Sequence, residues 1–488
     1  IINGPFTFSP DGNPLVGPIK GMTNFWSACA VMAGFSQGGG VGLSLANWIV
    51  DGDPGFDIWA MDISRFGDYA SMAFTNARVR ENYSRRFSIR YPNEELTAAR
   101  PFLTTPVYER QKAAGAQFGA TAGLETPLWF APEGLRDDFS WRRSTDFQYV
   151  AAECSAVREG VGLTDISGFA KYSIYGQGAR DWLDKILAAK IPPKGRMTLA
   201  PMLKEDGKVI GDFSLSNINE SRFLIIGSGA AESYHMRWLL DHLPDDGSVD
   251  LVSLNLELVG LSLAGPKSRS VLQACTAHDI SHGAMKFMSV REIDIGMVPA
   301  IVGRVSFTGD LGYEIWVKPE YQLNLYDQLM QAGESHGIRL FGSRALNSLR
   351  LEKNFSTWAR EYRPTYGPLE TGLDRFVDYD KEINFIGQEG ARAERLSGGK
   401  LRLRSFVVSA INADVIGDEP ISHKGKVVGW VTSGGYAHTS GVSVAQGYVP
   451  KEIADEEYGW EIEILDEQLP ATLQARPLFD SNSGRMRS

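Results

Sequence analysis

Residues 305–317, VSFTGDLGYEIWV, form the stretch around which the rest of the chain is arranged. Two β-prone runs flank a Gly-Asp-Leu-Gly turn, a pattern that predicts a β-hairpin. With the turn centred on Asp310 and Leu311, Phe307 falls opposite Glu314 on one face, where cross-strand Cβ atoms lie roughly 5 Å apart. An aromatic ring beside a carboxylate suits a flat, nitrogen-rich ring, because one group stacks and the other accepts N–H protons. The alternative is a half-buried hairpin whose glutamate points to water, as glutamates usually do.

Length, composition and charge limit the class of protein. The 488 residues are too many for one ordinary core and predict two to four domains. The composition is globular, with 43% hydrophobic, 22% charged and 11% aromatic residues. A formal net charge of −10 gives no basic surface for nucleic acid or an anionic membrane. We therefore expect neither among the partners of this protein.

The cysteine and histidine residues give no support for a disulfide framework or a metal site. Cys29, Cys154 and Cys275 are odd in number, lie far apart and form no C-x-x-C pair, which fits a reducing compartment and predicts a cytoplasmic protein. The seven histidines include one pair with H-x-x-x-H spacing, His278 and His282, but two ligands are too few for a metal site and none is expected. No run of about 18 apolar residues is present, so no transmembrane helix is expected.

The N-terminal region predicts a strand, a turn, a second strand and a long helix within residues 1 to about 60. The opening residues 1–4, IING, carry no methionine or signal peptide and resemble the interior of a sheet domain, so we expect a fragment, a processed chain or a partially ordered one. The first strand is expected at residues 6–8. A glycine-rich turn at residues 34–42 would expose free N–H groups at a helix start, where an anion or a flavin ring can bind. Tight helix–strand packing explains these glycines equally well.

The pattern along the chain then changes twice. Residues 60 to about 125 are rich in Arg and Tyr and broken by proline, which predicts a connecting segment without chemistry of its own. From residue 149 to about 340, short strands alternate with helices, as in an α+β domain. After residue 400, strands are expected at residues 401–410, 426–432, 442–449 and 460–465. Without long helices between them, these strands predict a small antiparallel barrel or sandwich.

A second stretch of interest is residues 204–213, KEDGKVIGDF. A tight turn at Gly207 leads into a strand in which Asp212 lies between apolar neighbours. An acidic residue that faces inward from a strand should be paired, hydrogen-bonded or functional. The alternative is an aspartate near a turn that caps backbone amides.

A third stretch, residues 341–353, FGSRALNSLRLEK, has helical periodicity with Arg350 near its far end. An arginine in this position can place its guanidinium fork on a carboxylate. The alternative is an internal salt bridge of Arg350 with Glu352 or Glu361.

Together, the three stretches resemble the tetrahydrofolate-dependent aminomethyltransferases, the T-protein family of the glycine cleavage system. The shared pattern is Gly-x-Val-x-x-Asp, then Phe/Tyr-x-Gly-x-x-Gly-x-Glu, then Arg-Leu-Glu on a helix, and it covers roughly residues 120–480. Residues 428–436, VGWVTSGGY, and 447–449, GYV, fit the C-terminal barrel of that family. The resemblance implies an α+β fold, with a three-lobed body, folate at its centre and a C-terminal antiparallel β-barrel.

The N-terminal region is similar to the end of the flavin domain in amine-oxidising flavoenzymes of the dimethylglycine and sarcosine dehydrogenase type. Residues 358–364, WAREYRP, also fit that branch better than the free T-protein. The G-x-G-x-x-G motif that holds the dinucleotide phosphates in those enzymes is missing from the sequence. FAD is therefore expected only with a further N-terminal part or a flavoprotein partner. The implied domains are a flavin-domain remnant at 1–60, a connecting segment at 61–125, a folate-binding domain at 126–395 and a barrel at 396–488.

The resemblance also assigns roles to single residues. Asp212 matches the essential aspartate, Glu314 the carboxylate that reads the pterin, and Phe307 the aromatic residue beside it, where most relatives have tyrosine. Gly211 stands where T-proteins commonly have an acidic residue. Arg350 is the candidate for the glutamate tail of folate. The candidate folate-binding residues also include Trp358 and Tyr436, which lie in the matching runs.

The implied activity is a one-carbon transfer that forms 5,10-methylenetetrahydrofolate. The carbon would come from the methylene iminium, or the formaldehyde, released when an N-methylglycine is oxidised. Asp212 would act as general base and stabilise the developing cation in a site that excludes water. Two other functions stay open: folate-dependent demethylation of a methylated sulfur or oxygen compound, and a non-catalytic folate-binding subunit of a flavoprotein.

Overall fold

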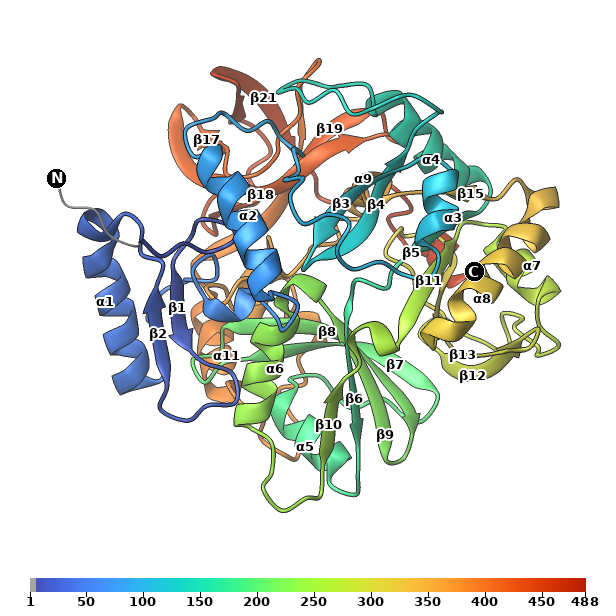
Figure 1. Cartoon of the computed structure of the whole chain (residues 1–488), viewed down its shortest axis with the longest axis horizontal. Helices are drawn as coiled ribbons and strands as arrows, with labels where there is room; N and C mark the ends of the chain where they lie inside the picture. The colour runs from blue at the N-terminus through green and yellow to red at the C-terminus, as the bar shows by residue number, and fades with distance from the viewer. Residues whose placement is uncertain (1–5) are drawn as a thin grey trace.

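The computed structural model describes residues 6–488, so the expectation for residues 1–4 lies outside the described residues. Figure 1 shows a small N-terminal module at the left edge, two β-sheets at the bottom and right, and a barrel at the top. The α+β character is confirmed.

The N-terminal module is a two-stranded ribbon with one long helix. It contains β1 (Leu15–Pro18), β2 (Trp26–Cys29) and α1 (Gly34–Asp51) around a small core of Val16, Val41 and Ile58. Residues 6–8 form no strand, contrary to the expectation. The glycine-rich turn was also predicted wrongly, because α1 begins at Gly34 and residues 38–42 already belong to the helix.

Residues 60–130 cross from this module to the rest of the molecule. They hold the short helix η1 (Ile63–Arg65), α2 (Met72–Ser84), α3 (Tyr108–Ala113) and the hairpin of β3 (Ala116–Thr121) and β4 (Leu124–Phe130). Helix α2 buries only Phe74 and Arg78. The segment therefore lies over its neighbours and forms little core of its own.

The first large sheet has five antiparallel strands in the order β10-β6-β9-β8-β7. Its strands are β6 (Ala170–Tyr175), β7 (Arg196–Leu203), β8 (Val209–Asn219), β9 (Arg222–Gly227) and β10 (Asp250–Ser253). Helices α5 (Ala179–Ile186) and α6 (Glu232–Asp241), the latter after η2 (Gly229–Ala231), cover one face, where Phe213, Leu215 and Ile225 form the core. The predicted turn at residues 204–207 joins β7 to β8.

The second large sheet has six strands in the order β12-β13-β14-β11-β5-β15. Its strands are β5 (Gly162–Asp165), β11 (Val259–Ala264), β12 (Val290–Ile295), β13 (Val298–Gly303), β14 (Gly312–Val317) and β15 (Arg339–Leu340). Helices α7 (Ser268–Ala274) and α8 (Pro319–Gly333) pack on one face, and the single-turn helices η3 (Asn255–Glu257) and η4 (Glu334–His336) lie in the connections.

The region around residues 305–311 is the main difference from the sequence prediction. Strand β13 ends at Gly303 and β14 begins at Gly312, so Glu314 lies opposite Gly303 and Ser262, not opposite Phe307. Side-chain oxygens of Ser306, Thr308 and Asp310 accept backbone N–H bonds within the segment, at 3.1–3.3 Å. These local bonds replace the cross-strand ladder and form a compact loop.

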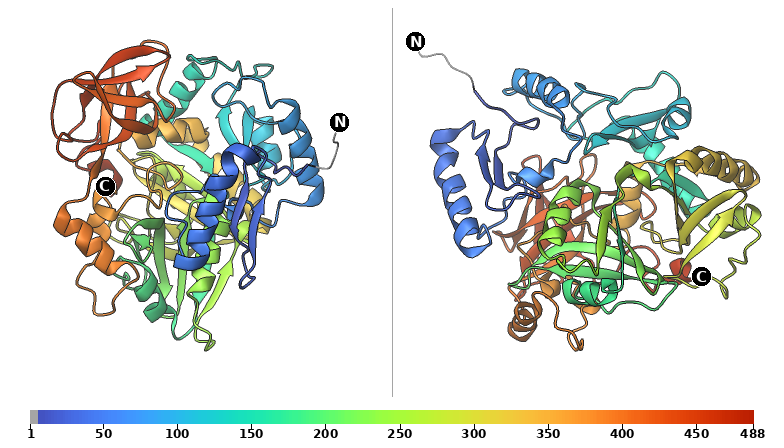
Figure 2. Two further views of the ribbon diagram at one scale, coloured as in Figure 1. Left: turned by 90° about the vertical axis from the view of Figure 1, so that its left-hand side faces the viewer. Right: turned by 60° about the horizontal axis from the view of Figure 1, so that its bottom comes forward.

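Four helices connect the second sheet to the barrel: α9 (Ser343–Leu351), α10 (Pro368–Thr371), η5 (Asp374–Phe376) and α11 (Gln388–Ser397). Helix α4 (Phe147–Glu159) precedes β5, and α12 (Gly484–Arg487) follows the barrel. The left view of Figure 2 shows the barrel above the sheets, and the right view shows the N-terminal module projecting from the side of the molecule.

The C-terminal barrel is closed, with strand order β16-β19-β18-β17-β20-β21. Its strands are β16 (Leu401–Val408), β17 (Pro420–His423), β18 (Lys426–Ala437), β19 (Val442–Pro450), β20 (Trp460–Ile464) and β21 (Glu467–Leu473). The four predicted strands are confirmed. The sequence missed β17 and β21, which contain Pro420 and Pro470, because proline argues against a strand in sequence alone.

No helix within residues 6–488 combines the length and the apolar character needed to cross a membrane.

Candidate active site

The two large sheets face each other, and both predicted carboxylates lie on the facing surfaces. In β8, Ser214 pairs with Ile226, whose side chain belongs to the apolar cluster between the sheets. Asp212 precedes Ser214 by two residues and therefore lies on the same face of the strand. In β14, Trp316 belongs to the same cluster, and Glu314 precedes it by two residues. Alternate residues of a strand point to one side. Asp212 and Glu314 therefore point into the same layer from opposite sheets.

Asp212 is half-buried in the interior. Burial raises the pKa of Asp212 to about 7; its own backbone N–H opposes this shift and the nearby Glu361 adds to it. No ion pair within the described residues involves Asp212. A carboxyl group that has a pKa near neutrality and no counter-charge is ready to accept a proton. The alternative role, capping of backbone amides near the turn, is limited to its own N–H.

Glu314 has a similar environment. Its side chain is half-buried, and burial alone raises the pKa of Glu314 to about 7. One neighbour across the sheet is Gly303, which has no side chain, and the other is the small Ser262. The small neighbours leave space beside the carboxylate, so a ligand with N–H donors fits this position better than a second protein side chain does.

Phe307 lies on the loop between β13 and β14 and is half-buried. Its ring stacks on Phe355, with centroids 5.7 Å apart and an interplanar angle of 25°. The sequence did not single out Phe355, which follows the arginine helix without a motif of its own. Two parallel rings make a platform on which a further flat ring can stack.

Tyr362 is another residue that the sequence did not assign. Burial raises the pKa of its hydroxyl and the charge of Asp212 raises it further, which places the phenol beside that carboxylate. The sequence signal was present, since Tyr362 lies within the run 358–364 that carries part of the resemblance.

Arg350 is buried in a network between α9 and the barrel. Its Nε donates to Asn347 Oδ1 at 3.0 Å. Its Nη1 donates to Phe355 O and Gln446 Oε1, and its Nη2 to Ser433 Oγ, each at 2.9 Å. Four of the five N–H donors are thus in use, so the guanidinium has no free fork for a ligand carboxylate. Its Nη1 also lies 3.9 Å from Glu361, the salt bridge that the alternative interpretation expected.

Trp358 is fully buried in an aromatic cluster. Its ring meets Trp59 and His235 at 4.9 Å and Tyr234 at 5.5 Å. Its Nε1 has no hydrogen-bond partner in the described part of the chain. The residue joins the N-terminal module, through Trp59, to the first sheet and its helix α6.

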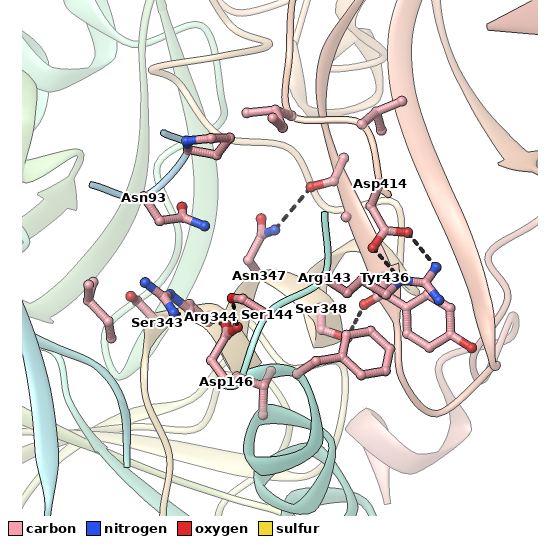
Figure 3. Close-up of a pocket in the computed structure, with 18 of the residues that line it drawn as sticks. Asn93, Arg143, Ser144, Asp146, Ser343, Arg344, Asn347, Ser348, Asp414 and Tyr436 are labelled. Atoms are coloured by element: carbon pink, nitrogen blue, oxygen red, sulfur yellow. Dashed lines mark hydrogen bonds and ion pairs between the residues drawn. The ribbon is translucent and has the colours of Figure 1, made fainter. Parts of the chain in front are cut away.

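Tyr436 lines a cavity of about 490 Å³ between α9, the loop before α4 and the barrel. Figure 3 shows its ring beside Arg143, whose guanidinium lies 4.2 Å from the ring centroid and pairs with Asp414 at 2.8 Å. Arg350 also lines this cavity. Five of the six candidate residues therefore form three groups: Asp212 and Glu314 between the sheets, Arg350 and Tyr436 at this cavity, and Trp358 in the aromatic cluster. Phe307 stacks on Phe355, whose carbonyl receives a bond from Arg350.

A mixed body of helices and two large sheets followed by a closed antiparallel barrel is the architecture of an aminomethyltransferase type of protein. Comparisons with known families agree. The family model "GCVT N-terminal domain" matches residues 107–381, and "Glycine cleavage T-protein C-terminal barrel domain" matches residues 402–480. A third model, "FAD dependent oxidoreductase central domain", matches residues 51–105. The chain therefore belongs to the GCVT family and is an enzyme of the aminomethyltransferase type, with part of a flavin-dependent oxidoreductase module in front.

Individual relatives support the same assignment. The chain is 36% identical over 490 residues to mitochondrial dimethylglycine dehydrogenase of Mus musculus, covering all of this chain and 56% of that protein. It is 30% identical over 497 residues to 4-methylaminobutanoate oxidase (formaldehyde-forming) of Paenarthrobacter nicotinovorans, covering all of this chain and 59% of that protein. The chain thus spans little more than half the length of these relatives. The solved aminomethyltransferase T of Bartonella henselae has the same fold, with a TM-score of 0.67 at 23% identity over 78% of this chain and 98% of that one.

Proposed function

We propose that this chain transfers a one-carbon unit to tetrahydrofolate held between the two large sheets. The observation that carries the proposal is the pair of uncompensated, half-buried carboxylates, Asp212 and Glu314, on facing strands. Leaving two acids without a counter-charge in the interior costs stability, and such a cost is retained where a ligand needs the groups.

In this proposal Glu314 recognises the pterin ring by hydrogen bonds. A reduced pterin presents a ring N–H and an amino group on one edge, and an ionised carboxylate accepts from both. The stacked rings of Phe307 and Phe355 offer a flat surface beside the ligand. Phenylalanine contributes stacking without a hydroxyl, so Glu314 supplies the polar contact.

Asp212 handles the proton of the reaction. The amine nitrogen of tetrahydrofolate attacks the methylene carbon of an iminium, a C–N bond forms, and the nitrogen loses its proton to the Asp212 carboxylate. The proton then leaves with the departing amine, and closure onto the second folate nitrogen releases one further proton. With formaldehyde as donor, water leaves in place of the amine. A site that excludes bulk water protects the iminium from hydrolysis.

The cavity beside the barrel is the proposed place for the glutamate tail of folate. Arg350 and Tyr436 line it, and Arg350 acts there mainly by fixing the wall, because its donors are already occupied. Arg142 and Arg360 also line this cavity and supply positive charge for carboxylates.

The N-terminal module is the proposed contact with a flavoprotein domain or subunit that oxidises the methylated amine. Helix α1 buries only Val41 and Ser44, and Phe35 is fully exposed. A Cβ added to any glycine at residues 38–40 would meet open space, so nothing in the described chain covers this face. The residues present fit a supporting surface and not a dinucleotide cradle. We propose that FAD, where it takes part, is bound by a further N-terminal part or by a partner. A cytoplasmic location remains a prediction.

The test combines binding and turnover. We expect calorimetry to show tetrahydrofolate binding to the wild-type chain and weaker binding to Glu314→Ala, with formation of methylenetetrahydrofolate from formaldehyde above the uncatalysed rate. Binding without turnover would favour the non-catalytic folate-binding subunit. Turnover of a methyl-sulfonium donor in place of formaldehyde would favour the demethylase. Absence of folate binding would refute the proposal.

A further inference from the structure

His235, on helix α6, contacts the strand that carries Asp212 from the side opposite to the proposed folate site. Its Nε2 lies 2.9 Å from the carbonyl oxygen of Ile210, and its ring is completely buried. The transfer chemistry described above gives this histidine no part.

The carbonyl that His235 contacts belongs to a β-bulge. Leu203 pairs with Val209 and Met202 with Gly211, which leaves Ile210 without a partner on β7. A bulge places two consecutive residues on nearly the same side of the strand and can re-aim the side chain that follows. Ile210 and Phe213 both lie in the core under α6, although their numbers differ in parity. The bulge thus shifts the alternation, and this shift turns Asp212 away from the core and towards the second sheet.

This end of β8 has few other hydrogen bonds to its neighbouring strands. Pairing with β9 begins only at Ser214, so Asp212 has no partner on that side. On the other side Asp212 lies opposite Pro201, which has no N–H to donate. The carbonyl of a bulged residue needs a donor when it is buried. His235 supplies that donor two residues before Asp212.

The chemistry of the ring fits a fixed donor. A carbonyl can only accept, so Nε2 carries the proton, and Nδ1 is buried with no partner among residues 6–488. Burial lowers the pKa of His235 to about 3, so the ring stays neutral in this tautomer. The rings of Phe213 and Trp358 hold it edge-on, with centroids 5.0 and 4.9 Å away. A Cβ on Gly211 would lie 2.8 Å from the ring of Phe213 and 3.1 Å from Nε2 of His235, so glycine leaves room for both rings.

We propose that His235 is a positioning residue for Asp212: its Nε2–H bond to Ile210 fixes the β-bulge that aims the carboxylate into the folate site. The inference rests on the proposed function of Asp212 and adds the residue that sets its direction. A side chain at position 211 would crowd both Phe213 and His235, so the glycine there fits this arrangement.

The test compares His235→Phe, which keeps a ring but loses the donor, with His235→Gln, whose amide nitrogen can reach the position of Nε2. We expect kcat for methylene transfer to fall about 10-fold or more in His235→Phe, since a small misplacement of a reacting group has effects of this size. Affinity for tetrahydrofolate should stay within about 2-fold, because Glu314 lies on the other sheet. His235→Gln should recover most of the rate. His242→Phe, at the end of the same helix, is the matched control, since that ring contacts Trp238 and Glu205 and not β8.

A second measurement needs no turnover. Infrared difference spectra against Asp212→Asn report the titration of the Asp212 carboxyl, which faces Glu361 and Tyr362. In His235→Phe we expect the pKa of Asp212 to move from near 7 towards its ordinary value as the carboxyl turns to water, with no such shift in His235→Gln. An unchanged titration and rate in His235→Phe would overturn the proposal. Equal losses in both variants together with lost folate affinity would also overturn it, because they indicate a purely structural role. A shifted titration in a chain without transferase activity would uphold His235 and refute the proposed function.

Discussion

Two of the groups of acidic side chains in the interior differ in whether a cation lies beside them. Around the loop at residues 305–311, Asp310 lies 3.5 Å from Arg158 and 3.0 Å from Arg485, and Glu352 lies 2.8 Å from Arg158. Between the sheets, Asp212 and Glu314 have no cationic partner within the described chain. The paired acids hold segments together, whereas the unpaired acids leave their charge available to a ligand.

The paired group explains how the loop with Phe307 is fixed. Arg158 donates to Thr308 O at 2.7 Å, and its guanidinium lies 3.6 Å from the ring centroid of Phe479 near the C-terminus. One arginine thus connects α4, the loop and the last segment of the chain.

The contrast between the two groups teaches that burial alone does not mark a functional acid. Glu153 is also buried without an ion pair in the described part of the chain, but it accepts from the backbone N–H groups of Phe130 and Gly342. The functional candidates are therefore buried acids that have neither a counter-charge nor donors from other residues.

The largest expected effect is on the paired side. Arg158→Ala leaves Asp310 and Glu352 buried with one cation fewer, so we expect the free energy of unfolding to fall by about 3–5 kcal/mol. Urea denaturation followed by fluorescence measures this. Arg110→Ala is the matched control, because its pair with Asp327 is exposed and should leave the unfolding midpoint unchanged. If both variants unfold at the same urea concentration, the paired group is not what holds this region.

The second largest effect concerns Asp212, one of the two acids without a cationic partner in the described chain, and the rate of methylene transfer. Asp212→Asn removes the proton acceptor and should lower methylene transfer about 100-fold or more. The same change removes an uncompensated charge, so the thermal midpoint at pH 8 should stay equal or rise. Transfer at the wild-type rate in Asp212→Asn would show that Asp212 takes no part in the mechanism. A lowered thermal midpoint would show that Asp212, like the acids that pair with arginine, stabilises the fold.

Much of this arrangement follows from sequence patterns that act locally. The turn at residues 204–207 and the late strands were predicted because turn residues and strand periodicity determine them at short range. The same holds for Asp212, which an apolar strand context marks as unusual.

Other features depend on contacts that the sequence does not show. The hairpin register was wrong because hydroxyl and carboxylate groups at Ser306, Thr308 and Asp310 satisfy backbone amides and widen the turn into a loop. His235 was not identified because its partner is a carbonyl that a β-bulge leaves without a strand partner. Hydrophobic periodicity in the sequence does not predict such a contact. The use of Arg350 became clear only when its four hydrogen-bond acceptors, from three separate segments, came together.

The last and smallest effect separates the two unpaired acids by pH. The proposed binding mode requires Glu314 to be ionised, and burial raises the pKa of Glu314 to about 7. Binding should therefore be weakened below pH 7, by roughly 10-fold between pH 8 and pH 6, and constant above it. Calorimetry in buffers of different ionisation enthalpy should detect proton release on binding near pH 6. Glu314→Gln should bind more weakly at pH 8 and lose the pH dependence, whereas Asp212→Asn should keep it.

Ionisation of Glu314 has the opposite effect on stability: it favours the proposed folate binding but disfavours folding. Because the pKa of Glu314 is raised on folding, the native state holds a proton more tightly than the unfolded chain between its ordinary pKa and about 7. Its ionisation therefore costs stability as pH rises through that window, by about 3 kcal/mol, and the cost is constant above it. Glu314→Gln should thus gain stability relative to wild type on going from pH 5 to pH 8, measured as the difference in unfolding free energy. A gain at pH 8 combined with weaker folate binding would show that this carboxylate is kept for the ligand and not for the fold.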